Sequence, residues 1–128
     1  MGSPITDLVI RIKNGYLARR ELIEAPYSTM RVEVLKKLKD LGYLKEFNIE
    51  GDKVKKINIT LEYKSGVPAV TDVKIYSKPG SRWYVRSKDL RPVLGNLGVS
   101  LLSTPNGVLT NREAKSQNIG GELLFDIW

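Results

Sequence analysis

Residues 98–110 read Gly-Val-Ser-Leu-Leu-Ser-Thr-Pro-Asn-Gly-Val-Leu-Thr, and this stretch decides how the C-terminal half folds. Two short apolar runs, 99–102 and 108–109, flank the hydroxyl-rich residues 103–107. Pro-Asn-Gly favours a tight turn, because proline restricts φ while asparagine and glycine tolerate positive φ. The pattern therefore predicts two antiparallel strands joined by a turn.

The rest of the C-terminal half alternates short extended segments with turn sequences. Lys-Pro-Gly-Ser at 78–81 is one such turn. Around it we expect strands, short helices and helix caps in this order: strands at 70–77 and 83–86, a helix capped by Asp89 and running through 97, a helical turn capped by Asn111, and a strand at 122–128.

Alternation along the strand after this turn separates the side chains into two faces. Arg82, Tyr84 and Arg86 share one face. Trp83 lies on the other face and is expected in the core. Cations can neutralise phosphates while an exposed aromatic ring stacks on a base or covers a ribose. The face that carries Tyr84 is therefore a candidate nucleic-acid contact.

The N-terminal half predicts two helices and three strands. The first helix has Ser3 as its N-cap and Pro4 at its first position, followed by apolar residues at helical spacing. The second begins after Ser28 and stops at Gly42. Three extended segments complete this half, at 21–25, 43–49 and 55–64.

These elements together predict an α+β fold of two small lobes. Ser-Gly-Val-Pro at 65–68 has the composition of a linker and marks the expected boundary. Residues 1–66 are the expected N-terminal α/β lobe, with the order helix-strand-helix-strand-strand. Residues 67–128 are the expected C-terminal lobe, mainly antiparallel β with short helices.

Composition limits the function classes open to the chain. Its 128 residues carry 21 Lys and Arg against 14 Asp and Glu, and the net charge of +7 favours polyanionic partners. The sequence has no His and no Cys, so the commonest general base and all thiolate chemistry are absent. It also lacks a phosphate-binding glycine motif and a metal-like carboxylate cluster. We expect no enzyme activity, no cofactor, no metal and no small-molecule substrate.

The longest uncharged stretch, 92–111, approaches the length of a membrane span. Gly95, Gly98 and the Pro-Asn-Gly turn interrupt it, and turns inside hydrocarbon would leave backbone groups unpaired. We expect no membrane partner. A basic peripheral membrane or protein-interaction module that uses the second helix is the alternative to a nucleic-acid-binding protein.

Two further features are candidate nucleic-acid contacts. Arg31 lies in the first turn of the second helix, where free backbone N–H groups could join it on a phosphate. The other cations of that helix are typical of a solvated face. The small hydroxyl and amide groups of 103–107 can reach base edges and 2′-hydroxyls in the shallow RNA minor groove, although they equally suit an ordinary hairpin turn.

Five motifs occur in order across nearly the whole chain: Ser-Pro-Ile-Thr-Asp (3–7) leading into Arg-Ile-Lys-Asn (11–14), Ser-Lys-Pro-Gly (77–80), Gly-Val-Ser-Leu-Leu-Ser-Thr (98–104), Gly-Val-Leu-Thr (107–110) and Gly-Gly-Glu (120–122). Together they resemble the ribosomal protein S8 family of the bacterial small subunit. The resemblance implies a two-lobe protein without catalytic activity that binds 16S ribosomal RNA in its central domain and supports subunit assembly. It also implies neighbouring small-subunit ribosomal proteins as partners, and a cytoplasmic or organellar ribosome as location.

The resemblance also implies which residues contact RNA. The 103–107 turn would enter the minor groove and carry the main base and ribose contacts, through Ser103, Thr104, Asn106 and Gly107. Flanking contacts would come from Glu122, Tyr84, Arg82, Arg31 and Thr6. Residues 67–128 would then be the RNA-binding lobe, with secondary backbone contacts from the N-terminal lobe.

Three positions depart from the family pattern. The turn usually reads Ser-Thr-Ser, then a variable residue and Gly, whereas here Pro105 takes the third place and removes one hydroxyl and one N–H. Asn106 brings no cation where Lys is common, and Thr29 replaces a usual Lys beside Arg31. We therefore leave Pro105 and Thr29 out of the expected site.

Overall fold

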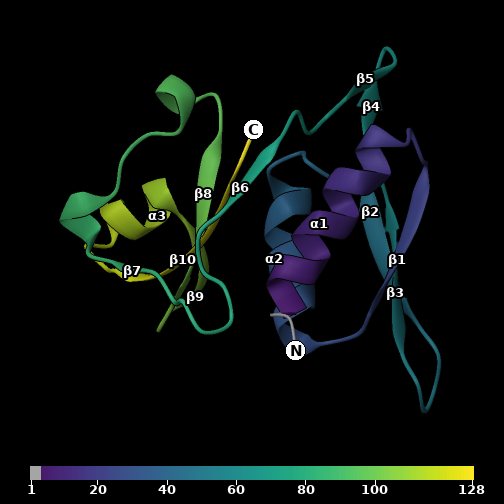
Figure 1. Cartoon of the computed structure of the whole chain (residues 1–128), viewed down its shortest axis with the longest axis horizontal. Coiled ribbons are helices and arrows are strands. Elements are labelled where there is room, and N and C mark those ends of the chain that lie inside the picture. The colour runs from purple at the N-terminus through teal and green to yellow at the C-terminus, as the bar shows by residue number, and fades with distance from the viewer. Residues whose placement is uncertain (1–3) are drawn as a thin grey trace.

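The computed structural model describes residues 4–128, which form two lobes (Figure 1). The N-terminal lobe contains α1 (Pro4–Leu17), β1 (Leu22–Pro26), α2 (Thr29–Asp40), β2 (Glu46–Glu50) and β3 (Lys56–Thr60). This order confirms the predicted helix-strand-helix-strand-strand arrangement. The strands pair antiparallel in the order β1-β3-β2. Figure 1 shows α1 and α2 between this sheet and the sheet of the C-terminal lobe.

The C-terminal lobe is mainly antiparallel β with short helices, as predicted. Its elements are β6 (Val73–Ile75), β7 (Tyr84–Val85), the 3-10 turns η1 (Ser87–Asp89) and η2 (Leu94–Asn96), β8 (Val99–Thr104), β9 (Gly107–Thr110), α3 (Asn111–Ser116) and β10 (Gly121–Ile127). The sheet order is β6-β10-β8-β9, and β7 pairs with the first residues of β10. The 98–110 stretch thus forms the predicted hairpin, and β10 lies beside it.

The helices form where the sequence places their apolar stripes and caps. In α1, Leu8, Val9 and Ile12 are fully buried, as their helical spacing predicts. The Ser28 side chain caps α2 by accepting a hydrogen bond from the backbone N–H of Arg31. Gly42, at φ 87°, follows its end. The expected Ser3 cap of α1 lies outside the described residues.

One hydrophobic core runs through both lobes. Leu8 and Ile12 of α1 belong to the same buried cluster as Leu101 of β8 and Phe125 and Ile127 of β10. A smaller cluster fills the other face of the C-terminal sheet, under α3. Burial of each large apolar side chain contributes about 1.5–3 kcal/mol, so this shared core holds the lobes in one arrangement.

Residues 65–68, the expected lobe boundary, lie in a tight hairpin. Strands β4 (Tyr63–Lys64) and β5 (Val67–Pro68) pair antiparallel. Ser65 and Gly66 form the turn with φ of 52° and 79°. Positive φ at both central positions is what a type I′ hairpin turn requires, and the Ser-Gly sequence permits it.

Two predictions about the 89–117 region were wrong. The expected helix from Asp89 through 97 is replaced by η1 and η2, because Pro92 disfavours a helical conformation at the residue before it, and because Leu94, Gly95 and Asn96 all have positive φ. The cap of α3 is Thr110 rather than Asn111. Thr110 and Glu113 form a reciprocal capping box, which also leaves the Asn111 side chain free to bond elsewhere.

An ion pair joins α2 to the C-terminal lobe. Lys37 Nζ lies 2.9 Å from Glu113 Oε1. Burial alone would raise the pKa of the Glu113 carboxyl, but hydrogen bonds from Lys37 and from the Thr110 N–H hold that pKa below its ordinary value of 4.5. A carboxyl that is more acidic in the folded state stabilises the fold above its unfolded pKa, and this contribution is lost as pH falls through the folded pKa.

We therefore expect Lys37→Gln to lower the free energy of unfolding by up to about 1 kcal/mol at pH 7, and by less at pH 3. Urea denaturation of both proteins at the two pH values measures the difference. Lys36→Gln is the matched control, since Lys36 is an exposed neighbour with no ion pair among residues 4–128. A deficit for Lys37→Gln that stays constant between pH 7 and pH 3 would contradict the role of Glu113.

Candidate nucleic-acid interface

The 103–107 turn is closed by its own side chains. The strands pair up to Thr104 opposite Gly107, so that Pro105 and Asn106 form the tip. The Thr104 hydroxyl donates to the carbonyl oxygen of Gly107 at 2.8 Å and accepts from the Asn106 N–H at 3.1 Å. Gly107 has φ 97°, which a residue with Cβ would adopt only under strain. The Thr104 hydroxyl therefore shapes the turn.

The other polar side chains of this turn are used differently. Asn106 Nδ2 donates to Gln117 Oε1 at 3.1 Å, which ties the tip to the end of α3. Among the described residues, the Ser103 hydroxyl has no hydrogen-bond partner, although Ser103 is half-buried. Ser103 therefore presents a donor and an acceptor to an external ligand, and Gln117 is a supporting residue that the sequence did not reveal.

Sheet register places three of the expected site residues in one row. Tyr84 of β7 is opposite Glu122 of β10, and Glu122 is opposite Ser103 of β8. Directly opposed residues of an antiparallel sheet project from the same face. Tyr84 is 71% exposed, so its ring is accessible at one end of the row, with Glu122 between it and Ser103. The structure thus brings together residues that are distant in sequence.

An arginine neutralises the carboxylate in this row. Arg82 Nη1 donates to Glu122 Oε2 at 3.2 Å, and the Glu122 side chain is 19% exposed. A free carboxylate would repel RNA phosphates, whereas a paired one keeps its lone pairs as acceptors with less net charge. Strand alternation predicted the face of Arg82 but not this pair, because the partners are on different strands.

Thr6 approaches the same row from the N-terminal lobe. Thr6 is half-buried in α1 and lines a small cavity together with Arg82 and Ser77. The cavity lies where the first turns of α1 pack against β6 and β10. Thr6 is thus linked through this cavity to Arg82, and Arg82 to the row. We call the group formed by Thr6, Arg82, Glu122, Tyr84 and Ser103 the hydroxyl face.

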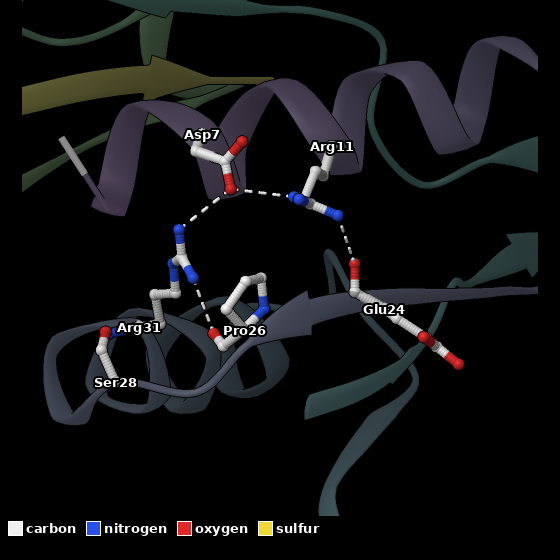
Figure 2. A network of polar contacts seen from close by, with 6 residues as sticks. All are labelled: Asp7, Arg11, Glu24, Pro26, Ser28 and Arg31. Carbon is white, nitrogen blue, oxygen red and sulfur yellow. Dashed lines mark hydrogen bonds and ion pairs between the residues drawn. The ribbon is translucent and has the colours of Figure 1, made fainter. Parts of the chain in front are cut away.

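The Arg31 guanidinium lies between the starts of α1 and α2, where it makes hydrogen bonds within the protein (Figure 2). It is only 7% exposed. Its guanidinium donates to Asp7 Oδ2 at 2.9 Å and to the carbonyl oxygen of Pro26 at 2.7 Å. Asp7 also accepts from Arg11 Nε at 2.8 Å. Arg31 thus connects the starts of α1 and α2 with the end of β1, which the sequence did not predict.

Trp83 is a correction to the sequence-based assignment. It was expected in the core but is 51% exposed, with its ring edge against Tyr76 at a centroid distance of 5.5 Å. Trp83 directly precedes β7, a two-residue strand at the sheet edge that pairs with β10, and at this position its ring is only partly covered. The Ser77 side chain fixes the Trp83 backbone through a hydrogen bond from its N–H.

Metal and membrane features are not found in the described part of the chain. Residues 4–128 contain no group of three or more acidic side chains placed to hold a metal ion. None of the helices described is long and apolar enough to cross a membrane.

Comparisons with known proteins cover the full length of the chain. Residues 3–128 match the protein family described as Ribosomal protein S8. The small ribosomal subunit protein uS8 of Mycoplasma mobile is 42% identical over 126 residues, covering 98% of this chain and 95% of the relative. The uS8 protein of Acholeplasma laidlawii is 43% identical over 129 residues, covering 100% and 98%, and that of Pseudomonas savastanoi is 40% identical over 128 residues, with the same coverage.

Matches of this length and identity define the class of the protein as a structural, non-enzymatic component of the small ribosomal subunit. Within that class, the chain belongs to the ribosomal protein S8 family. The resemblance stated from the sequence motifs is confirmed. Membership implies ribosomal RNA binding and a role in translation.

Proposed function

We propose that this protein binds 16S ribosomal RNA directly in its central domain, through the hydroxyl face and the 103–107 turn, and supports assembly of the subunit. The observation that carries the proposal is the Ser103 hydroxyl, which has no hydrogen-bond partner among residues 4–128 and lies in one row with a neutralised Glu122 and an exposed Tyr84. Neighbouring small-subunit ribosomal proteins are proposed as further partners.

The chemistry of this row suits the minor groove of an irregular RNA helix. A hydroxyl can donate to and accept from a ribose 2′-hydroxyl, and the groove of A-form RNA is wide and shallow enough to admit a turn. Glu122 Oε atoms accept base N–H groups, while the Arg82 guanidinium limits repulsion by phosphates. The Tyr84 ring can stack on an unpaired base or a ribose.

Some residues of the turn are proposed to contact RNA, and others fix the conformation of the turn. The Ser103 hydroxyl is proposed to hydrogen-bond to RNA, and the Thr104 hydroxyl keeps the backbone of the tip in one conformation. Pro105 removes a hydroxyl relative to the family pattern but restricts φ, so less conformational entropy is lost when the turn is ordered on RNA. Asn106 is held by Gln117 and offers its remaining amide hydrogen and carbonyl oxygen, and Gly107 permits close backbone approach.

The two N-terminal residues of the expected site are assigned different roles. Thr6 borders the hydroxyl face and is proposed to contact the RNA backbone. Arg31 is proposed to act through the positions of the helix starts, because its guanidinium is buried against Asp7 and Pro26. A direct phosphate contact by Arg31 would require this network to open.

The alternative function, a membrane or protein-interaction module, would need an exposed apolar face on α2. Val34, Leu35 and Leu38, the central residues of the apolar stripe of α2, are fully buried in the core of the protein. A surface helix binds a membrane through an exposed apolar face. The packing of α2 therefore favours the RNA-binding proposal.

We expect Ser103→Ala to weaken binding to an RNA helix with an internal loop about tenfold, equivalent to about 1.4 kcal/mol, while the free energy of unfolding stays the same. Thr104→Val should weaken the same binding while also lowering the free energy of unfolding by about 1 kcal/mol, because it opens the turn. Filter binding at moderate salt and urea denaturation measure the two effects.

The control for these variants is Ser116→Ala, an exposed serine on α3. An uninterrupted RNA duplex serves as the nonspecific ligand. Equal losses of Ser103→Ala on the looped helix and on the duplex would show that Ser103 does not read RNA structure. Absence of any preference of the unmodified protein for the looped helix would refute the proposed function itself.

A further inference from the structure

A pocket at the start of α3 gathers three cations that the hydroxyl face does not use. Arg91, Arg112 and Lys115 line a surface hollow of about 430 Å³. Asn96 and the buried Asn111 also line it. We call this hollow the cationic pocket.

The positive charge of this pocket is not compensated within the protein. Of residues 4–128, no carboxylate lies within ion-pair distance of Arg91, Arg112 or Lys115. The nearest acidic residues in sequence point elsewhere: Glu113 pairs with Lys37 across the lobes, and Asp89 pairs with Arg86. A concentrated, unpaired charge of this kind attracts anions, and the planar fork of arginine matches the oxygens of a phosphate.

Internal hydrogen bonds hold the pocket in place. The Asn111 side chain donates to the carbonyl oxygen of Arg91 at 2.9 Å and accepts from the Ser100 N–H at 3.3 Å. Arg112 Nη2 donates to the carbonyl oxygen of Asn96 at 3.0 Å, and Lys115 Nζ donates to that of Leu90 at 3.4 Å. These bonds leave other N–H groups of both cations available, and they position them before any ligand arrives.

Helix α3 connects the cationic pocket to the RNA-contacting turn. Its first residues line the pocket, and Gln117 at its end holds Asn106 in the tip of the turn. A six-residue helix is about 9 Å long. The wide minor groove of A-form RNA is bordered by phosphate backbones, so an RNA helix that receives the turn carries phosphates close to the pocket at the other end of α3.

We propose that the cationic pocket binds backbone phosphates of the same RNA whose minor groove receives the 103–107 turn. The inference rests on the proposed function and adds a second, sequence-independent contact on the opposite end of α3. Such a contact sets the orientation of the RNA without selecting its bases.

The test compares two variants that remove the same net charge. Arg112→Gln with Lys115→Gln removes cations of the pocket, and Lys36→Gln with Lys39→Gln removes exposed cations of α2 as the matched control. RNA affinity is measured against salt concentration for the looped helix and the duplex. Each lost phosphate contact lowers the slope of log affinity against log salt by about 0.7–0.9. For the pocket variant, we expect the slope to fall by about 1.4–1.8 and the affinity to fall about tenfold on both RNAs. For the α2 control, we expect little change in slope or affinity.

A second variant, Arg91→Gln, removes a cation of the pocket without breaking a hydrogen bond that holds the pocket together. Its side chain has no hydrogen-bond partner among residues 4–128, so its replacement should leave stability unchanged and still lower the slope by about 0.8. Equal slopes for the pocket variants and the α2 control would overturn the proposal. Saturable calorimetric binding of inorganic phosphate, lost in the pocket variants while their RNA slopes stay unchanged, would assign the pocket to a free anion and would also overturn it.

These outcomes are separate from the test of the proposed function. The pocket variants should retain the preference for the looped helix over the duplex, since phosphate contacts do not depend on base identity. A missing preference in the unmodified protein would refute the role of the hydroxyl face, whereas the salt slopes would still report on the pocket.

Discussion

Gly121→Ala is expected to lower the free energy of unfolding by about 1–3 kcal/mol and to weaken binding to a looped RNA helix about a hundredfold. Gly121 begins β10, beside the residues that form the hydroxyl face. A Cβ at this position would collide with the carbonyl oxygen of Ser103 and lie 3.0 Å from Thr104 Cγ2. The backbone of β8 must then move away from β10, which breaks the row of Tyr84, Glu122 and Ser103 that we propose to contact RNA.

Urea denaturation and RNA binding at a temperature where both proteins are folded separate the two effects. Gly66→Ala is the control: Gly66 also has an unfavourable φ for alanine, 79°, but a Cβ there would meet no atom within 4 Å, and Gly66 lies in the remote β4–β5 hairpin. It should cost about 1–2 kcal/mol with no change in RNA preference. If Gly121→Ala is destabilised but still prefers the looped RNA helix over the duplex, the row of Tyr84, Glu122 and Ser103 does not recognise RNA structure.

Arg31→Met is expected to lower the free energy of unfolding by about 2 kcal/mol. Breaking a buried ion pair costs about 3–5 kcal/mol, and the cost is smaller here because Asp7 is partly exposed and keeps its bond to Arg11. Arg31→Lys should cost about 1 kcal/mol, since one ammonium group does not reproduce the two-directional donation of the guanidinium to Asp7 and Pro26 (Figure 2).

The same variants test whether Arg31 touches RNA. If Arg31 acts by positioning the helix starts, both folded variants should keep the salt slope of the unmodified protein. A slope lowered in Arg31→Met and retained in Arg31→Lys would instead assign Arg31 a phosphate contact. Arg11→Met is the control, because Arg11 binds the same Asp7 oxygen from an exposed position and should cost less than about 0.5 kcal/mol.

The elements that could be predicted from the sequence are those specified by local patterns. The apolar stripe of α1, the Ser28 cap of α2 and the 98–110 hairpin each depend on residues within a few positions of one another. The predictions failed where unusual backbone conformations occur. Three successive positive φ values at 94–96 end the helix that was expected from Asp89 through 97.

The sequence by itself determined the two-lobe α+β class, the chemistry of the 103–107 turn and the family resemblance. Tertiary structure decided which side chains are free to bind RNA. Arg82 meets Glu122 across 40 positions, Arg31 meets Asp7 across 24, and Asn106 meets Gln117 across 11. Such pairs form only after sheet register and core packing bring their elements together, and no local pattern encodes that distance. For this reason only the folded structure shows that the Ser103 hydroxyl is available to a ligand and that Arg31 links the starts of α1 and α2.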